Sequence, residues 1–346
     1  MSDVSSRSDS AFALVLPGVG EPLQWQPAKR REPGRGEVRV RMQAAAINPS
    51  DRMFVAGTYG VKPSPPCVPG FEGVGVVEAC GSGLLPRAMK DRRVAVAAPK
   101  GGTWQTHVVT KADRIVPIGD DIPDEIAASF FVNPATAYVM TRRVLGLSSG
   151  DTLVQTAAAS SLGRMIVRLN ARDDIQTVCI VRHESQRDAL LADGAAAVIV
   201  FDAAEDAPER LADQLRDAEA TTGPIRHAID PVGGRLTTAL LAGLQDDAHV
   251  LVYGSLADEP FEIAPRSLLF HRQRVEGFAL GAWLDEQSLV SKGRLFWTLR
   301  KLVADGTLAA DRTKAFAPDD AAAALDPAST ASGEKGVFRF SAEEPD

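Results

Sequence analysis

In the middle of the chain, short runs of apolar residues alternate with amphipathic stretches, and turn-forming residues separate the two. A buried strand is predicted at residues 153–156, followed by a turn of small residues at 157–163, an amphipathic helix and a second strand at 177–181. Three further apolar runs predict additional parallel strands with helices between them: residues 197–200, 227–230 and 249–253. Strands that alternate with helices form a parallel sheet covered by helices, so this region is predicted to be an α/β domain.

The two ends of the chain have a different pattern. Short β-rich runs, separated by Pro-Gly and Gly-Ser-Gly turns, predict a compact and mainly antiparallel β domain: residues 38–46, 74–79, 93–97 and 105–109. A helical stretch at 125–145 leads into the α/β region. After that region, helices are predicted at 289–305 and 319–325 and strands at 313–317 and 336–340. We expect this C-terminal segment to return to the β domain and complete it.

The turn at residues 157–163 has the position of a dinucleotide-binding turn. In such a unit the pyrophosphate lies on the helix N-terminus, where free N–H groups and the helix dipole favour an anion. Of the three glycines in the usual pattern, only Gly163 is present. The second strand ends in Arg182, with Arg187 nearby, where NAD-binding proteins carry an acidic residue. A guanidinium there suits the 2′-phosphate of NADPH, although the turn alone also fits an ordinary α/β protein.

Composition restricts the classes of protein that remain. A chain of 346 residues is long enough for two domains, and its net charge of −7 argues against nucleic acid and anionic membranes as partners. Residues 1–10 lack the apolar core of a signal peptide and are expected to form a disordered tail. The three cysteines show no paired spacing, so neither a disulfide framework nor a zinc lobe is predicted. A cytoplasmic protein with a small-molecule substrate is expected.

Several motifs together resemble the zinc-free branch of the medium-chain dehydrogenase/reductase superfamily, which contains quinone oxidoreductases and 2-enoyl thioester reductases. The motifs are Ala46-Ile47-Asn48-Pro49-Ser50-Asp51, Gly57-Thr58-Tyr59-Gly60, Pro69-Gly70-Phe71-Glu72-Gly73, Gly102-Thr103-Trp104, Asn133-Pro134-Ala135-Thr136-Ala137-Tyr138 and Asp230-Pro231-Val232-Gly233-Gly234. The resemblance implies an α/β fold, with a Rossmann doubly wound parallel sheet and a GroES-like β domain formed by both chain ends. It places the β domain at residues 11–125 and 288–346, the NADPH-binding domain at 126–287, and implies a homodimer.

The same resemblance allows metal chemistry to be examined. Zinc-dependent members of the superfamily have a cysteine where this chain has Asn48 and a histidine where it has Phe71. Phenylalanine cannot bind a metal, a neutral asparagine is a poor zinc ligand, and Glu72 alone cannot hold a catalytic zinc. We therefore expect no metal.

Without a metal, a side chain must stabilise the charge that develops on the substrate oxygen. In enoyl thioester reductases a tyrosine of the Gly-x-Tyr turn does this, and the resemblance places Tyr59 in that position. A phenol stays protonated at neutral pH and can donate a hydrogen bond to a thioester carbonyl. The alternative is that Tyr59 only packs in its turn. Asn48, at the position of the zinc-binding cysteine, is the second catalytic candidate.

The resemblance also implies the residues that bind NADPH. Asn133, Phe278, Ala279 and Leu280 would lie near the nicotinamide, and Lys335 would reach in from the C-terminal segment. The remaining candidates are Ala159, Ser160, Ser161, Leu162 and Gly163 at the pyrophosphate, Arg182, His183, Glu184 and Arg187 at the 2′-phosphate, and Tyr253, Gly254, Ser255 and Leu256 after the fifth strand. Glu184 would repel a phosphate if its side chain pointed inward, and His183 could offset this repulsion when protonated.

The expected activity is NADPH-dependent reduction of an activated carbon–carbon double bond, in a 2-enoyl thioester or a related enone. Two alternatives remain open. One is an NADPH:quinone oxidoreductase. The other is a non-catalytic NADPH-binding protein, and it stays open because the turn at 157–163 has two serines and lacks two of the usual glycines.

Overall fold

The computed structural model describes residues 11–331 and 333–340, so the predicted tail at 1–10 lies outside the described residues. The chain divides into two compact units. The first contains the residues up to Val132 and those from Ala309 onward, and the second is Asn133–Leu308. Helix α11 (Leu289–Ala304), which was predicted to belong to the β domain, is grouped with the second unit by its contacts. The assignment of the ranges 11–125, 288–346 and 126–287 to substrate and cofactor binding remains our proposal.

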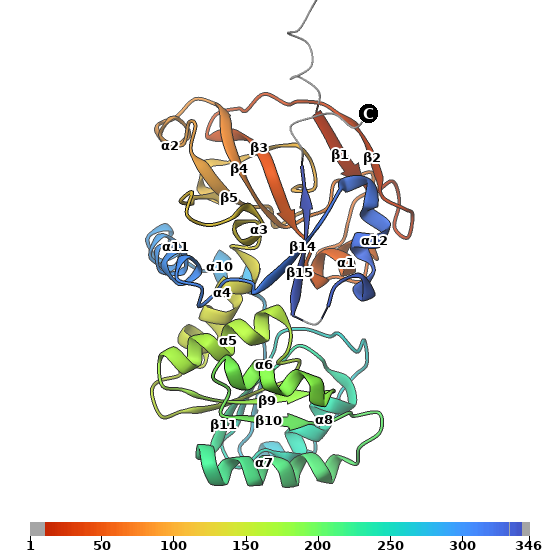
Figure 1. Cartoon of the computed structure of the whole chain (residues 1–346), viewed down its shortest axis with the longest axis vertical. Coiled ribbons are helices and arrows are strands. Elements are labelled where there is room, and N and C mark those ends of the chain that lie inside the picture. Colours follow the sequence, from red (N-terminus) through yellow and green to blue (C-terminus); the bar gives the residue numbers. More distant parts are fainter. Residues whose placement is uncertain (1–10, 332, 341–346) are drawn as a thin grey trace, which may run out of the picture. The chain divides into compact units, whose positions relative to one another are not determined.

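The second unit is built on one parallel six-stranded sheet (Figure 1). Its strands, in spatial order, are β10 (Ala197–Val200), β9 (Gln176–Val181), β8 (Thr152–Gln155), β11 (Ile225–Asp230), β12 (His249–Val252) and β13 (Arg274–Gly277). All of the pairings are parallel, and the strand order reverses between β8 and β11, which is where doubly wound sheets bind ligands. The predicted Rossmann sheet is thereby confirmed.

Helices precede, connect and follow these strands. They are α4 (Val132–Val139), α5 (Ser161–Arg172), α6 (Arg187–Ala192), α7 (Pro208–Thr222), α8 (Gly234–Gly243), α9 (Pro265–Leu269), α10 (Leu280–Asp285) and α11, with a short 3-10 turn at Glu184–Gln186. The helix predicted at 125–145 is interrupted. It is replaced by α3 (Asp124–Ala127), α4 and a π-helical turn at Met140–Val144.

The first unit is built on a mainly antiparallel sheet. Its strands run in the order β14 (Arg312–Phe316), β15 (Glu334–Arg339), β3 (Glu37–Ala46), β4 (Glu72–Cys80), β5 (Arg93–Ala97) and β7 (Ile115–Pro117), and β6 (His107–Lys111) also pairs with β3. A two-stranded sheet is formed by β1 (Ala11–Val15) and β2 (Gln24–Ala28). Because β15 pairs antiparallel with β3, with Phe338 opposite Ala45, the C-terminal segment completes this unit as predicted.

Short helices close the first unit: α1 (Pro49–Val55), α2 (Leu84–Ala88), α3 and α12 (Ala321–Leu325), with 3-10 turns at Ala112–Arg114, Pro318–Asp320 and Pro327–Ser329. The core of this unit contains Trp104, whose side chain is fully buried and whose indole N–H donates to the carbonyl oxygen of Ala46 at 3.0 Å. The ring of Phe338 meets the indole edge to face, so the C-terminal strand also packs into this core. In the described part of the chain, no helix has the length and apolar character needed to cross a membrane.

Candidate active site

The turn after β8 uses alanine where a glycine is usual. Ala157 has a left-handed backbone, with φ at 48°, whereas Ser160 has an ordinary extended conformation, with φ at −67°. The hydroxyl of Ser160 accepts a hydrogen bond from the N–H of Gly163 at 3.1 Å and caps α5. A non-glycine residue in the left-handed region costs roughly 1–2 kcal/mol. The backbone strain in this turn is therefore located at Ala157 and not at Ser160.

Gly163 is the one glycine that this turn requires. A Cβ atom at this position would lie 2.4 Å from the carbonyl oxygen of Ala158, so any side chain would push α5 away from the turn. The amide of Gln155, at the end of β8, donates to the carbonyl oxygen of Gly163 at 3.0 Å. Helix α5 is thus held close to β8, with its N-terminus at the carboxyl edge of the sheet, where a pyrophosphate is bound in dinucleotide-binding folds.

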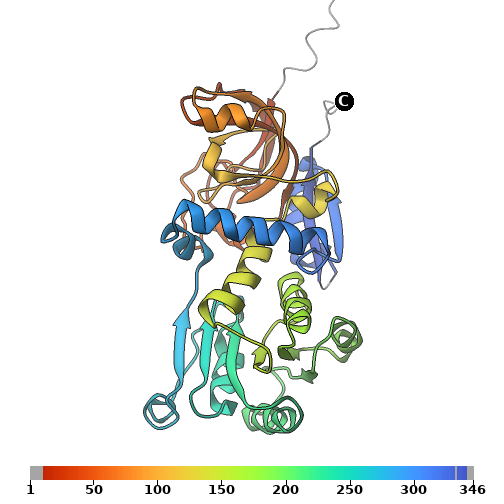
Figure 2. The same ribbon diagram turned by 90° about the vertical axis from the view of Figure 1, so that its left-hand side faces the viewer.

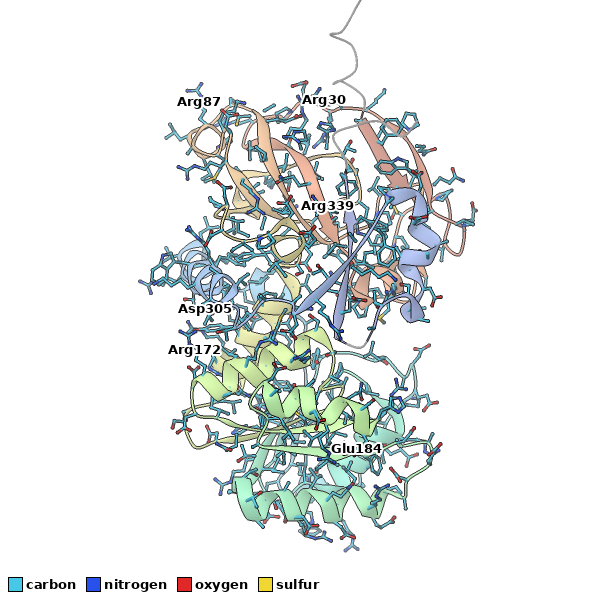
Figure 3. The ribbon with its side chains drawn as sticks, viewed as in Figure 1. Arg30, Arg87, Arg172, Glu184, Asp305 and Arg339 are labelled. Atoms are coloured by element: carbon cyan, nitrogen blue, oxygen red, sulfur yellow. The ribbon has the colours of Figure 1, made fainter. Side chains whose placement is uncertain are left out.

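The segment after β9 contains the predicted 2′-phosphate residues. The side chains of Arg182 and His183 are exposed, whereas Glu184 forms an ion pair with Arg187. Arg187 also donates to the carbonyl oxygen of Val198 at 2.8 Å, and the hydrogen bond from Arg187 lowers the pKa of Glu184. Figure 3 labels Glu184 near this edge of the sheet. The charge of Glu184 is thus offset by Arg187. Arg182, the other arginine of this segment, has no acidic partner among the described residues.

At the end of β11, the buried carboxylate of Asp230 joins three elements. It accepts hydrogen bonds from the Thr156 hydroxyl, from the Thr237 hydroxyl at 2.5 Å and from the Gly233 N–H at 2.9 Å. Asp230 was singled out from the sequence only as part of a motif, and this bracing role was not predicted. An acidic residue that directly follows a buried strand and precedes Pro-Val-Gly-Gly is the signal that could have identified it.

The predicted residues after β12 are fixed by the same region of the fold. The N–H of Tyr253 donates to the Asp230 carbonyl oxygen at 2.9 Å, and that of Leu256 donates to the Pro231 carbonyl oxygen at 3.0 Å. Gly254 and Ser255 line an open hollow of about 440 Å³, together with Gly233, Val252, Asp258, Glu259, Pro260 and Phe261. At the end of β13, the N–H of Phe278 donates to the Val252 carbonyl oxygen at 2.8 Å, and Ala279 and Leu280 begin α10.

Most of the cofactor candidates in the second unit therefore lie at the carboxyl ends of parallel strands. These are the residues after β8, β9, β12 and β13, and such sites are where open parallel sheets bind ligands. Asn133 is the exception because it lies in the first turn of α4, where its side chain is half-buried. Lys335 belongs to the first unit, on β15.

In the first unit, four polar side chains form a buried cluster. Asn48 precedes α1, Asp51 lies in its first turn, Glu72 begins β4 and Lys335 lies on β15, and none is more than 4% exposed. The Asn48 amide donates to Glu72 Oε1 at 3.0 Å, and its carbonyl oxygen accepts a hydrogen bond from the Lys335 ammonium. Both polar side-chain atoms of Asn48, Nδ2 and Oδ1, thus form hydrogen bonds within the cluster.

The two carboxylates of the cluster are also held by backbone N–H groups. Asp51 accepts from the N–H of Asn48 at 2.7 Å and from that of Phe71 at 3.0 Å. Glu72 Oε2 accepts from the N–H groups of Phe131 and Val132 at 2.8 and 2.9 Å, which are at the start of α4. For Asp51 and Glu72, the sequence predicted no roles beyond the motifs that contain them.

Burial dominates the electrostatics of this cluster. It raises the pKa of Asp51 to about 7 and raises the pKa of Glu72, and in both cases the Lys335 charge only partly opposes the effect. Burial also lowers the pKa of Lys335, although the two carboxylates favour its charged form. Burial is therefore the main cause of the raised pKa of Asp51, and the nearby Glu72 charge adds to it to a smaller extent.

Tyr59 lies in the turn that follows α1. The N–H groups of Thr58 and Tyr59 both donate to the Met53 carbonyl oxygen, at 2.9 and 3.1 Å, and Gly57 is left-handed with φ at 72°. The phenol ring is half-buried and packs against Phe71, with ring centroids 5.5 Å apart. Burial first, and the nearby Asp51 charge second, raise the pKa of Tyr59. The phenol therefore stays protonated at neutral pH and is a hydrogen-bond donor.

The positions that carry metal ligands in the zinc enzymes have other uses here. Asn48 is engaged by Glu72 and Lys335, and Phe71 contributes its ring to the contact with Tyr59. Across residues 11–331 and 333–340, no three His, Cys, Asp or Glu side chains are grouped so as to hold a metal ion. The three cysteines, Cys67, Cys80 and Cys179, are free thiols.

Comparison with known proteins identifies the superfamily to which the chain belongs. Residues 34–120 match the alcohol dehydrogenase GroES-like domain family. The mitochondrial enoyl-[acyl-carrier-protein] reductase of Xenopus tropicalis is 33% identical over 299 residues, covering 85% of this chain and 84% of that protein. The chain belongs to the medium-chain dehydrogenase/reductase superfamily, in the branch of the quinone oxidoreductases and 2-enoyl thioester reductases.

Solved structures agree with this placement. A Mesorhizobium loti protein assigned to the NADPH:quinone reductases is 27% identical, with a TM-score of 0.86 over 96% of this chain and 99% of that one. The quinone oxidoreductase of Thermus thermophilus, which has been solved with NADPH, is 25% identical, with a TM-score of 0.77 over 95% of this chain and 100% of that one. The predicted fold and superfamily are confirmed.

Proposed function

We propose that the protein is an NADPH-dependent, zinc-free reductase of 2-enoyl thioesters, and that its substrate is carried by an acyl carrier protein or by coenzyme A. The observation that carries the proposal is Tyr59. Its phenol is protonated, is fixed in a turn against Phe71, and has no hydrogen-bond partner among the described residues. Such a donor can bind a thioester carbonyl oxygen and stabilise the enolate that forms there. The 33% identity to an enoyl-[acyl-carrier-protein] reductase supports a thioester over a quinone.

The residues at the sheet edge fit NADPH. The N-terminus of α5, where Gly163 allows the helix to approach the turn closely, suits the pyrophosphate. The exposed guanidinium of Arg182 suits the 2′-phosphate. When bound, NADPH would supply the hydride for the β carbon of the substrate. Tyr59 would polarise the carbonyl, and it, or a water that it orients, would deliver the proton to the α carbon.

A role for the buried cluster also follows from its contacts. Asp51 binds the N–H of Phe71, whose ring supports Tyr59, and Asn48 and Lys335 hold the start of α1 beside Glu72. We propose that Asn48 acts on the reaction by positioning the α1–Tyr59 segment. Lys335 shares this role, in place of or in addition to the cofactor contact expected from the resemblance.

One assay separates this function from its alternatives. The purified protein is incubated with NADPH and either crotonyl-CoA or a small quinone, and the loss of NADPH absorbance is followed. Consumption with crotonyl-CoA is expected. Consumption with the quinone alone would replace the proposal by a quinone oxidoreductase, and consumption with neither would favour a non-catalytic NADPH-binding protein.

Assembly and location remain proposals. We propose a homodimer, because β13 is an edge strand of the described sheet, and the end of α9 with its C-cap Phe270 exposes Leu268, Leu269 and Phe270 by 46%, 70% and 66%. Light scattering that gives the mass of a single chain would contradict it. A cytoplasmic location was expected from the sequence, whereas the Xenopus tropicalis relative is named as mitochondrial. Cell fractionation in the source organism would decide between these compartments.

A further inference from the structure

Helix α11 has an unusual charge for a helix in an acidic protein. It contains Lys292, Arg294, Arg300 and Lys301 and no acidic residue, whereas the whole chain has a net charge of −7. Helix α7 provides the internal comparison, because its sequence PERLADQLRDAEATT mixes both signs and is more acidic than basic. Helix α5 also carries only basic charges, but Arg164, Arg168 and Arg172 each pair with an aspartate. The distinguishing feature of α11 is therefore that its arginines lack such acidic partners among the described residues.

The charges share one face with exposed apolar side chains. Leu289, Val290 and Trp297 are 72%, 65% and 62% exposed. The other exposed residues of the helix are Gly293, Arg294, Arg300, Lys301 and Ala304, and the buried ones are Leu295, Leu299, Leu302 and Val303. Spacings of three and four residues put the exposed set on a single stripe. Figure 2 shows α11 as the long blue helix, with no other element drawn over it.

The stripe has a defined arrangement. The ammonium of Lys301 lies over the Trp297 ring, 3.5 Å from its centroid, which holds the indole against the helix surface. In the described part of the chain, Arg294 and Arg300 form no ion pair. Asp305, the acid that follows the helix, is paired with Arg172 of α5 at 2.5 Å, and Figure 3 shows these two side chains labelled together. Asp305 is thus engaged by Arg172, and the end of α11 is tied to α5.

We propose that this stripe is the docking surface for the carrier protein that presents the enoyl thioester, through an acidic face of that carrier. The inference rests on the proposed function, because it names the partner that would bring the substrate. Arginine and tryptophan are the residues that most often dominate protein interfaces, and unpaired cations would steer an acidic partner to this helix.

A membrane surface fits the stripe less well. A helix that lies in a lipid interface buries a broad apolar face, whereas this stripe has three large apolar side chains among its cations. The net charge of −7 would also repel the chain from anionic lipid. A protein partner with complementary charge is therefore the occupant we commit to.

The test compares crotonyl-carrier protein with crotonyl-CoA as substrates. In the triple variant Arg294→Glu/Arg300→Glu/Lys301→Glu, the KM for the carrier-bound substrate should rise by about tenfold or more, and the salt dependence of that KM should weaken. The kcat and KM for crotonyl-CoA should stay within about twofold of the parent values, because coenzyme A carries no protein surface. Trp297→Ala should raise the KM for the carrier-bound substrate in the same selective way.

A matched control uses three exposed basic residues of the first unit, Arg87, Lys111 and Arg114, changed together to glutamate. These variants have the same change in net charge, so an equal loss of carrier use in the control would overturn the docking assignment. An unchanged KM in the α11 variant, or equal losses with both substrates, would also overturn it.

Direct binding keeps the two proposals separable. Immobilised protein is titrated with crotonyl-carrier protein in the absence of NADPH, and also with anionic phosphatidylserine vesicles. If the parent protein reduces neither substrate, the proposed function fails, but selective loss of carrier binding in the α11 variant still supports the docking face. Binding to vesicles, with no carrier binding that depends on α11, would replace the carrier protein by a lipid surface and overturn the inference.

Discussion

The buried ammonium of Lys335 donates a hydrogen bond to the side-chain oxygen of Asn48 and so joins the C-terminal strand to the start of α1. The same ammonium is the only positive group of the cluster defined by Asn48, Asp51, Glu72 and Lys335. One member of the cluster, Asn48, occupies a position where the zinc enzymes of this superfamily have a metal ligand. A lysine side chain here supplies the positive charge that the two carboxylates need.

Lys335→Met should destabilise the protein by roughly 3–5 kcal/mol, because it leaves two buried carboxylates without a counter-charge. The double variant Lys335→Met/Glu72→Gln removes one charge of each sign and should recover part of the loss. Urea denaturation measures both effects. If Lys335 contacted only the cofactor, the single variant would keep its stability and lose affinity for NADPH.

Tyr59→Phe should lower kcat for crotonyl-CoA by about 10²–10³-fold, or roughly 2.7–4 kcal/mol, with a smaller effect on KM. The ring contact with Phe71 is retained in this variant, so its melting temperature should match that of the parent. Quinone reduction should be less sensitive, because quinone carbonyls are themselves the electron sink. Thioester reduction at the parent rate would show that Tyr59 only packs in its turn.

Arg182→Ala should weaken NADPH binding by about 10- to 150-fold, which corresponds to a charge-assisted contact of roughly 1.5–3 kcal/mol, and should leave NADH binding unchanged. The matched variant is Arg187→Ala, because the Arg187 guanidinium is already engaged by Glu184 and by the Val198 carbonyl oxygen. It should have a smaller effect. Fluorescence titration of both cofactors checks this, and equal losses for NADPH and NADH would contradict the 2′-phosphate assignment.

The pKa of Asp51, raised from 3.8 to about 7, predicts how stability depends on pH. Between pH 3.8 and about 7, Asp51 is protonated in the folded protein but ionised in the unfolded chain. The free energy of unfolding should therefore fall as the pH rises through this range and level off above about pH 7. Three pKa units correspond to a ceiling of roughly 4 kcal/mol. Denaturation curves at several pH values, for the parent and for Asp51→Asn, measure the effect. The same slope in both proteins would assign it to other groups.

The side chains of Asn48 and Phe71 occupy two positions that bind zinc in related enzymes, and neither is a competent zinc ligand. The purified protein should therefore contain no stoichiometric zinc. Chelators should leave crotonyl-CoA reduction unchanged. Elemental analysis provides the measurement, and about one zinc per chain would be the contrary result.

The parallel sheet could be predicted from the sequence because strands such as β9 and β10 contain continuous apolar runs. The edge strand β13 could not, because Arg-Val-Glu-Gly has no apolar run and the strand forms by pairing with β12. The helix predicted at 125–145 was wrong at residues 128–131, because Glu72, distant in sequence, accepts hydrogen bonds from the N–H groups of Phe131 and Val132 where α4 begins.

The candidate site divides in the same way. Gly163 and Arg182 could be placed from local sequence, since a strand and a turn fix where they lie. The orientation of Glu184 could not, because it depends on the ion pair with Arg187. The buried cluster also escaped prediction, because it joins residues from three separate elements, and no local pattern shows that Asp51, Glu72 and Lys335 meet.

The contact between Asn48 and Lys335 spans 287 positions, and this separation has a consequence for how the protein is made. At about 5–20 residues per second, the ribosome needs roughly 15 to 60 s to pass from one to the other. During that time Asp51 and Glu72 are already present, but Lys335, whose charge favours their ionised forms, has not been synthesised. The sheet of the first unit therefore stays incomplete until the second unit has been synthesised and β15 can pair with β3.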